Sequence, residues 1–137
     1  MYATATLTLD YRADLALLMA RWLAEPSARA QHEAEYTTLL QYGQQHHTSR
    51  WLLDVRRRPQ PCPLMAAWIV QEWLPQVVAA LAPQRLRLAY LISPARGEAV
   101  QQDTALHATV QTATQPTQPY DLMVFGDEGL AMRWLLA

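Results

Sequence analysis

Hydrophobic and polar positions alternate with a period of two at the start of the chain, and many later segments follow the helical period. Ala3 to Asp10 alternates threonine with apolar residues, which is typical of a half-buried strand. Asp14 to Leu23 is ambiguous, because its apolar residues fall on one helical stripe behind a capping Asp14, whereas residues 11–14 equally suit a turn between two antiparallel strands. The pattern alone favours a helix there, and the strand pair stays open as the alternative.

The middle of the chain gives clearer signals. Pro26 and Ser27, a chain breaker and a good N-cap residue, predict a helix that runs to about His47. Arg50 to Val55 is short and apolar, as expected of a buried strand, and the prolines within residues 56–63 predict a loop after it. The side chains expected on the buried stripe of the helix are His32, Tyr36, Leu39, Leu40 and Gly43.

The second half of the chain alternates helices and strands. Leu64 to Ala82 is helical in composition, and Pro75 predicts two shorter helices of which it opens the second. Leu86 to Ile92 follows as a strand, and Glu98 to about Thr112 as a weakly amphipathic helix. Residues 109–119 contain a Thr/Gln/Pro stretch, expected to be a surface loop, and Tyr120 to Phe125 is the last strand. The final helix is expected to be capped by Asp127 and to bury Leu130, Ala131, Trp134 and Leu135.

This order of elements predicts the fold class. Strands that alternate with helices from residue 50 onward imply right-handed crossovers and parallel pairing. We therefore expect an α/β fold with a mixed, mostly parallel sheet of four or five strands and helices packed on it. A chain of 137 residues is about the size of one domain.

Composition narrows the function classes. Eleven basic and twelve acidic residues give a net charge of −1, so no basic excess suggests nucleic-acid binding. Cys62 is the sole cysteine, which excludes an intrachain disulfide and multi-cysteine metal sites. The longest uninterrupted apolar run, Leu64 to Val70, is far short of the roughly 20 residues that span a bilayer. We expect a soluble cytoplasmic protein without a membrane span.

Catalytic and cofactor chemistry finds little support in the residues. No Gly-x-Ser-x-Gly or Gly-x-Gly-x-x-Gly motif occurs, and there is no lysine for a Schiff base. His46 and His47 are adjacent and so point to different sides of a helix. The sequence predicts no catalytic residues, no metal, no cofactor and no enzymatic activity.

An arginine run is the main candidate for ligand binding. Arg56, Arg57 and Arg58 follow the end of a predicted central strand, where open α/β sheets bind their ligands, and Arg96 follows the next strand. Arginine matches phosphate or carboxylate with a planar fork of donors. Trp68 is a further candidate for lining a groove. The alternative is that Arg56 pairs with Asp54 or a helix end while the other two are solvated.

Several motifs together follow the order of a known family. They are Trp22, Glu35-Tyr36, Trp51-Leu52-Leu53-Asp54-Val55-Arg56, Trp68, Pro75, Arg87-Leu88-Ala89-Tyr90 and the segment 125–135, which reads Phe-Gly-Asp-Glu-Gly-Leu-Ala-Met-Arg-Trp-Leu. In these motifs nearly the whole chain resembles the SpoIIAA-like proteins of the STAS superfamily, small bacterial cytosolic proteins that mostly have no assigned function.

The resemblance carries expectations of its own. It implies one STAS-like domain over residues 1–137, with Asp14 to Leu23 as a second strand paired with the first. It also implies a non-enzymatic regulatory module that docks on a protein partner or a second copy. Relatives in this superfamily that resemble lipid or nucleotide carriers supply the alternative, a binder of a small anionic or lipid-like ligand. STAS-type anti-anti-sigma factors are switched by phosphorylation of a Ser or Thr at the start of the helix after the central strand. This chain has neither residue between Ser49 and Ser93, so we expect the scaffold without the phosphorylation switch.

Overall fold

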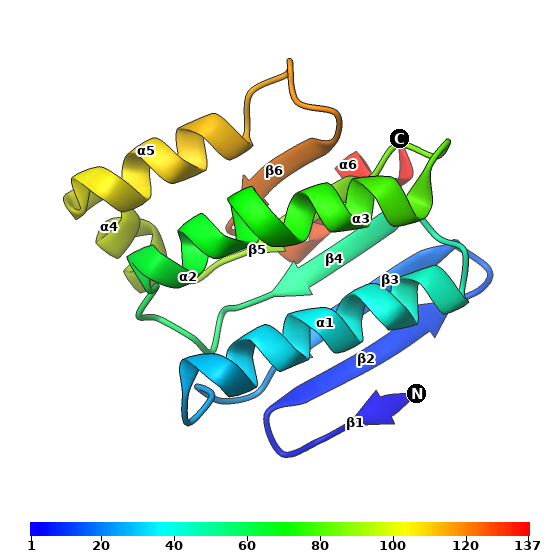
Figure 1. Ribbon diagram of the computed structural model, residues 1–137, viewed down its shortest axis with the longest axis horizontal. Helices are drawn as coiled ribbons and strands as arrows, with labels where there is room; N and C mark the ends of the chain where they lie inside the picture. The colour runs from blue at the N-terminus through cyan, green and yellow to red at the C-terminus, as the bar shows by residue number, and fades with distance from the viewer.

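A six-stranded sheet in the order β1-β2-β3-β4-β5-β6 runs through the computed structural model, which describes residues 1–137 (Figure 1). The β1-β2 and β2-β3 pairs are antiparallel, and the β3-β4, β4-β5 and β5-β6 pairs are parallel. The α/β class and the mixed sheet are confirmed, but the sheet has more strands than the four or five expected. The strands are β1 (Tyr2–Ala3), β2 (Leu7–Arg12), β3 (Leu17–Trp22), β4 (Arg50–Asp54), β5 (Arg87–Leu91) and β6 (Asp121–Phe125).

Helices cover both faces of this sheet. In Figure 1, α1, α2, α3 and α5 lie in front of the sheet, whereas α6 lies behind it. The helical elements are α1 (Arg29–Gln45), α2 (Pro63–Trp68), the π-helical turn η1 (Ile69–Trp73), α3 (Leu74–Leu81), α4 (Pro94–Gln102), α5 (Thr104–Ala113) and α6 (Glu128–Leu136).

The segment from Asp14 to Leu23 is a strand, so the helix favoured by its pattern is wrong. Leu17 to Trp22 forms β3, which pairs antiparallel with β2 from Leu7↔Trp22 to Arg12↔Leu17. A tight turn with Ala16 at a φ of 49° joins the two strands. Pairing with β2 on one side and β4 on the other outweighs the helical propensity of the segment, as the family resemblance implied.

The helix after Pro26 is confirmed as α1, but Ser27 does not cap it. Its N-cap is Ala28, and the Ser27 hydroxyl donates to Gln31 Oε1 instead. Gly43 allows α1 to lie directly on the sheet, because a Cβ there would be 2.1 Å from Trp51 Cζ2. Four of the five expected stripe residues are buried; Leu40 is only partly buried.

The segment from Leu64 to Ala82 follows one helical path without a break. The N–H of Leu74 bonds the carbonyl of Ile69, five residues earlier, as in a π-helix. Pro75 then lies in the first turn of α3, where its missing N–H is harmless. The place of Pro75 in the first turn of α3 agrees with the prediction, but α2, η1 and α3 form one continuous helix where two shorter ones were expected.

The helix expected from Glu98 to Thr112 is divided in two. Asp103 ends α4 and caps α5, since its Oδ1 accepts from the N–H of Leu106 at 2.9 Å. The predicted Thr/Gln/Pro loop is correspondingly shorter, because α5 includes its residues 109–113.

Two apolar clusters hold the layers together. The larger lies between the sheet and the front helices and buries Trp22, Tyr36, Trp51 and Trp73 almost completely. The smaller packs α6 on the opposite face through Ala131 and Leu135. Leu130 was expected to be buried with them, but it is 51% exposed, because α6 contacts the sheet through residues four apart and Leu130 lies off that stripe.

Candidate ligand-binding site

Arg56 and Arg58, two residues apart in the loop after β4, contact opposite layers of the molecule. Arg56 hydrogen bonds Glu128 at the start of α6, and Arg58 hydrogen bonds His32 on α1. Because α6 and α1 cover opposite faces of the sheet (Figure 1), the arginine run is divided between two separate environments.

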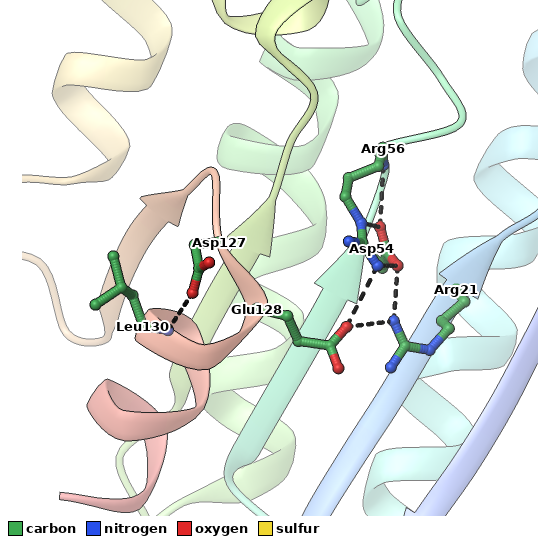
Figure 2. A network of polar contacts seen from close by, with 6 residues as sticks. All are labelled: Arg21, Asp54, Arg56, Asp127, Glu128 and Leu130. Atoms are coloured by element: carbon green, nitrogen blue, oxygen red, sulfur yellow. Dashed lines mark hydrogen bonds and ion pairs between the residues drawn. The ribbon is translucent and has the colours of Figure 1, made fainter.

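Arg56 belongs to a closed network of two arginines and two carboxylates (Figure 2). Its Nε and Nη2 donate to the two oxygens of Asp54 at 3.0 and 2.8 Å. Arg21 Nη1 donates to Asp54 Oδ2 at 2.7 Å and to Glu128 Oε1 at 2.8 Å. These bonds connect the start of α6 to the ends of β3 and β4. Because two arginines face two carboxylates, the network contains no unpaired cation.

Asp127 completes the start of α6 beside this network. Its Oδ1 accepts a hydrogen bond from the N–H of Leu130 at 2.9 Å (Figure 2), which confirms the predicted cap.

The pKa of Asp54 reflects the network. Burial raises it, but hydrogen bonds from Arg56 and Arg21 outweigh burial, and the pKa lies below its ordinary value.

Arg58 is buried and already has a counter-ion. Only 3% of the residue is exposed, and its Nε donates to Glu25 Oε2 at 3.1 Å. Its Nη1 lies 2.6 Å from His32 Nε2, and its guanidinium carbon lies 6.0 Å from the centre of the Trp22 ring. Because a guanidinium only donates, the His32 ring accepts at Nε2.

His32 is held in its neutral form. Burial, together with the positive charges of Arg58 and Arg96, lowers its pKa to about 3. The neutral ring can accept from Arg58, whereas a protonated ring would set two donors against each other. His32 therefore adds no charge to its surroundings near pH 7.

Arg96 is a cation without a carboxylate partner. It lies in the first turn of α4, where Ser93 Oγ accepts from its backbone N–H. Its Nη1 donates to the backbone carbonyl of Arg58 at 2.7 Å, and no Asp or Glu lies within ion-pair distance of its side chain. Burial lowers its pKa below the ordinary arginine value. Arginine remains charged at neutral pH even so, and this charge is poorly solvated.

Two tyrosine hydroxyls lie beside this cation. Tyr36 Oη on α1 and Tyr90 Oη on β5 are 2.8 Å apart. Burial raises the pKa of both phenols, so both remain neutral hydroxyls. One of the two protons makes the bond between the hydroxyls, which leaves one O–H to donate elsewhere.

These polar groups line one cavity with a largely apolar wall. The cavity has a volume of about 280 Å³. Fifteen of its 22 lining residues are hydrophobic, so it suits an apolar molecule more than a fully polar one. The polar contributors are His32, Tyr36, Arg58, Tyr90 and Arg96. The apolar wall includes Met65 on α2, Ile69 on η1, Leu74 on α3, Leu106 and Val110 on α5, and Leu122 on β6.

The structure brings together only part of the residue set expected from the sequence. Arg58 and Arg96 meet at the cavity, which confirms that Arg96 converges on the arginine run. Arg56 lies in the closed network instead, as its alternative interpretation held, and Arg57 is exposed without an ion pair. Arg58 is not solvated, contrary to that alternative. Trp68 packs edge-on against Tyr36 with ring centres 6.3 Å apart and does not line the cavity.

The sequence analysis missed the aromatic part of the site. His32 and Tyr36 were assigned to the packing stripe of α1 by their spacing of four, and that spacing also brings both to the cavity. Tyr90 was part of a strand. The sequence feature that could have identified Tyr90 is its position inside the apolar run from Leu88 to Leu91, because a buried phenol hydroxyl needs a hydrogen-bond partner.

No cluster of three His, Cys, Asp or Glu side chains is arranged to hold a metal ion, and Cys62 is exposed at the rim of the cavity. The absence of a metal or cofactor stays a prediction.

The helical segment Pro63–Leu81 is long and apolar enough to cross a membrane by length and composition alone, with a mean hydropathy of 1.3. Helices packed in a core pass the same test, so this is weak evidence for a span.

No protein-family model matches the chain, and no match was found among curated proteins or solved structures. The resemblance to SpoIIAA-like proteins therefore stays a prediction.

Proposed function

We propose that this protein binds a small amphipathic molecule with an apolar body and an anionic end group. The observation that carries the proposal is the combination of an apolar cavity with a guanidinium, that of Arg96, that has no carboxylate partner. A partly open recess with a largely apolar lining is the usual form of a small-molecule site. Arg96 is partly buried, and a cation in such a place without a counter-ion is a suitable partner for an anion supplied from outside.

The size of the cavity limits the ligand. An apolar cavity of about 150 Å³ takes up benzene, so one of about 280 Å³ suits a molecule of roughly a dozen non-hydrogen atoms. A medium-chain fatty acid has this size and the required amphipathic character. A nucleotide is larger and more polar than the apolar wall favours.

The cavity favours a binding protein over the other function classes. A regulatory docking module would be supported by one flat apolar surface patch. The exposed large hydrophobic side chains are instead spread over the N-terminus, β1, α2, β6 and α6, and they are Met1, Tyr2, Leu64, Met123, Val124 and Leu130. No nucleophile with an adjacent acid–base pair lines the cavity. We therefore keep the expectation of a non-catalytic protein, with regulation by a protein partner as an untested prediction.

Thermal denaturation with and without added amphiphile tests the proposal. Decanoate and decyl phosphate are the anionic probes, and 1-decanol is the neutral one. An anionic probe at about 100 times its Kd should add about 2.7 kcal/mol to the free energy of unfolding. The neutral probe at the same concentration should add less, because it binds more weakly. If neither anion raises the melting temperature, the proposal is wrong.

A cavity-filling variant makes this test specific. Ala66→Phe places a ring in the cavity and should abolish the stabilisation by decanoate. Ala79→Phe, on an exposed position of α3 away from the cavity, is the matched control and should keep it. Equal loss in both variants, or retention in both, would show that the probe binds elsewhere.

A further inference from the structure

We infer that the end group of the ligand is a monoanion of the carboxylate class, and that Glu25 sets this selectivity by neutralising Arg58. The inference rests on the proposed function, because it concerns the same cavity. It goes further in naming the charge of the ligand and the residue that determines it.

The charges at the polar end of the cavity do not cancel. Arg58 and Arg96 line the cavity and contribute two positive charges. Glu25 lies outside the lining and contributes one negative charge through its ion pair with Arg58 at 3.1 Å. The histidine and the two tyrosines there are neutral. Glu35, the other nearby acid, accepts from Trp22 Nε1 and the Thr6 hydroxyl and, unlike Glu25, forms no ion pair with an arginine of the cavity. One positive charge remains for the ligand to balance.

Electrostatics in a poorly solvated site make this count decisive. A monoanion brings the local sum to zero, whereas a dianion such as a phosphate monoester leaves one negative charge buried among apolar side chains. An uncompensated charge in such a place carries a large desolvation cost. A neutral end group would leave the Arg96 charge without a partner.

The number of free donors supports the same conclusion. The Arg96 guanidinium keeps donors beyond the one given to the Arg58 carbonyl, and the tyrosine pair has one remaining O–H. Arg58 gives its Nε–H to Glu25 and one Nη1–H to His32 Nε2. This set suits the two oxygens of a planar carboxylate better than the three terminal oxygens of a phosphate.

Glu25 is open to substitution without disturbing the cavity wall. Its side chain is 46% exposed, and Arg58 is also held by His32 and by the face of Trp22. In Glu25→Gln, Arg58 therefore keeps its place but loses its counter-ion. The polar end of the cavity then carries two unbalanced positive charges.

Calorimetric titration at about pH 8, where a phosphate monoester is a dianion, tests the inference. Wild-type protein should bind decanoate at least about tenfold more tightly than decyl phosphate. In Glu25→Gln the ratio should shift toward decyl phosphate by about tenfold or more. Glu33→Gln, which removes the same charge from an exposed pair with Arg29, is the matched control and should keep the wild-type ratio.

Arg96→Gln gives an independent measurement, since glutamine can still donate to the Arg58 carbonyl. Decanoate should then bind no more tightly than 1-decanol, and Arg133→Gln on α6 should leave decanoate binding unchanged. Wild-type protein that binds decyl phosphate as tightly as decanoate, or a ratio unmoved in Glu25→Gln, overturns the inference while the proposed function stands. Protein that binds neither anion overturns the proposed function itself.

Discussion

The closed network on the α6 side and the cavity on the α1 side are two arginine clusters at the same end of the sheet, and only the first has as many carboxylates as arginines. In the closed network Arg21 and Arg56 are matched by Asp54 and Glu128 (Figure 2). In the cavity Arg58 and Arg96 are matched by Glu25 alone. The first cluster joins secondary-structure elements, and the second retains one positive charge beside an apolar space.

The comparison shows that the partners of an arginine, and not its place in the sequence, decide its role. Arg56 and Arg58 leave the same loop two residues apart. The partners of Arg56 are Asp54, on the strand before it, and Glu128, 72 residues later. The partners of Arg58 come from the region before β4, through Glu25 and His32. A cluster whose charges balance stabilises the fold, whereas an unbalanced one is available for a ligand at some cost to stability.

The largest expected effect follows from opening the closed network. Asp54→Ala leaves Arg21 and Arg56 with only Glu128 between them and should lower the free energy of unfolding by about 3 kcal/mol, discounted for the partial exposure of both arginines. Urea denaturation measures the loss. Asp14→Ala removes an acid from the exposed pair with Arg12 and should cost no more than about 0.5 kcal/mol. Equal losses in the two variants would contradict a special role for the network.

Acid should act on the two regions at different pH values, and the cavity side should respond first. The pKa of His32 is lowered to about 3 by burial, so the unfolded chain takes up its proton near pH 6.5 and the folded chain does not. Stability from this residue is therefore present above pH 6.5 and is lost as the pH falls. The loss should reach about 2 kcal/mol by pH 5. Urea denaturation of wild type and His32→Gln over this pH range measures it, and the variant should show a flatter dependence.

The closed network should respond only at lower pH. The pKa of Asp54 lies below its ordinary value, so its contribution is present above the unfolded-state value near 4 and is lost below it. His107→Gln serves as the control for the histidine substitution, because His107 does not line the cavity. A pH dependence between 6.5 and 5 that is the same in wild type and in His32→Gln would contradict this assignment.

Removal of the unbalanced cation should have a smaller effect on the fold. Arg96→Leu takes a poorly solvated charge out of an apolar site, at the loss of one hydrogen bond to the Arg58 carbonyl. The free energy of unfolding should change by less than about 1 kcal/mol and can rise. Urea denaturation without ligand is the measurement. A loss as large as that of Asp54→Ala would mean that Arg96 is primarily structural.

The fold followed from the sequence wherever a segment had one consistent pattern. The helix with the buried stripe of His32 and Tyr36, the strands β4, β5 and β6, and the cap at Asp127 were all predicted and are present. The segment that forms β3 was assigned to a helix, because its leucines suit both periods and the strands on either side of it decide the outcome. The π-turn before Pro75 has no separate signal in the sequence.

The candidate site was predicted only in part, for a related reason. The position of an arginine run after a central strand located the correct end of the sheet. The pattern could not show which side of the sheet each arginine contacts, since Arg56 and Arg58 are separated by their partners Glu128 and His32. The cavity depends on the spacing between α2 and α5, which is a property of tertiary packing.

The smallest expected effect concerns the start of α2, at the rim of the cavity. Cys62 is the N-cap residue of this helix, with an extended backbone and no hydrogen bond from its side chain to the helix. A serine hydroxyl at this position can accept from the N–H two or three residues later, as N-cap side chains do. Cys62→Ser should therefore raise the free energy of unfolding by about 0.5 kcal/mol, and Cys62→Ala should not. Position 62 lies at the rim of the cavity, away from Arg96, and the serine hydroxyl is engaged by the helix N–H, so the Kd for decanoate should be unchanged within about twofold. Urea denaturation and calorimetry measure the two quantities. A large loss of decanoate affinity in Cys62→Ser would place the thiol among the groups that contact the ligand and would move the anionic end of the ligand toward the rim, away from Arg96.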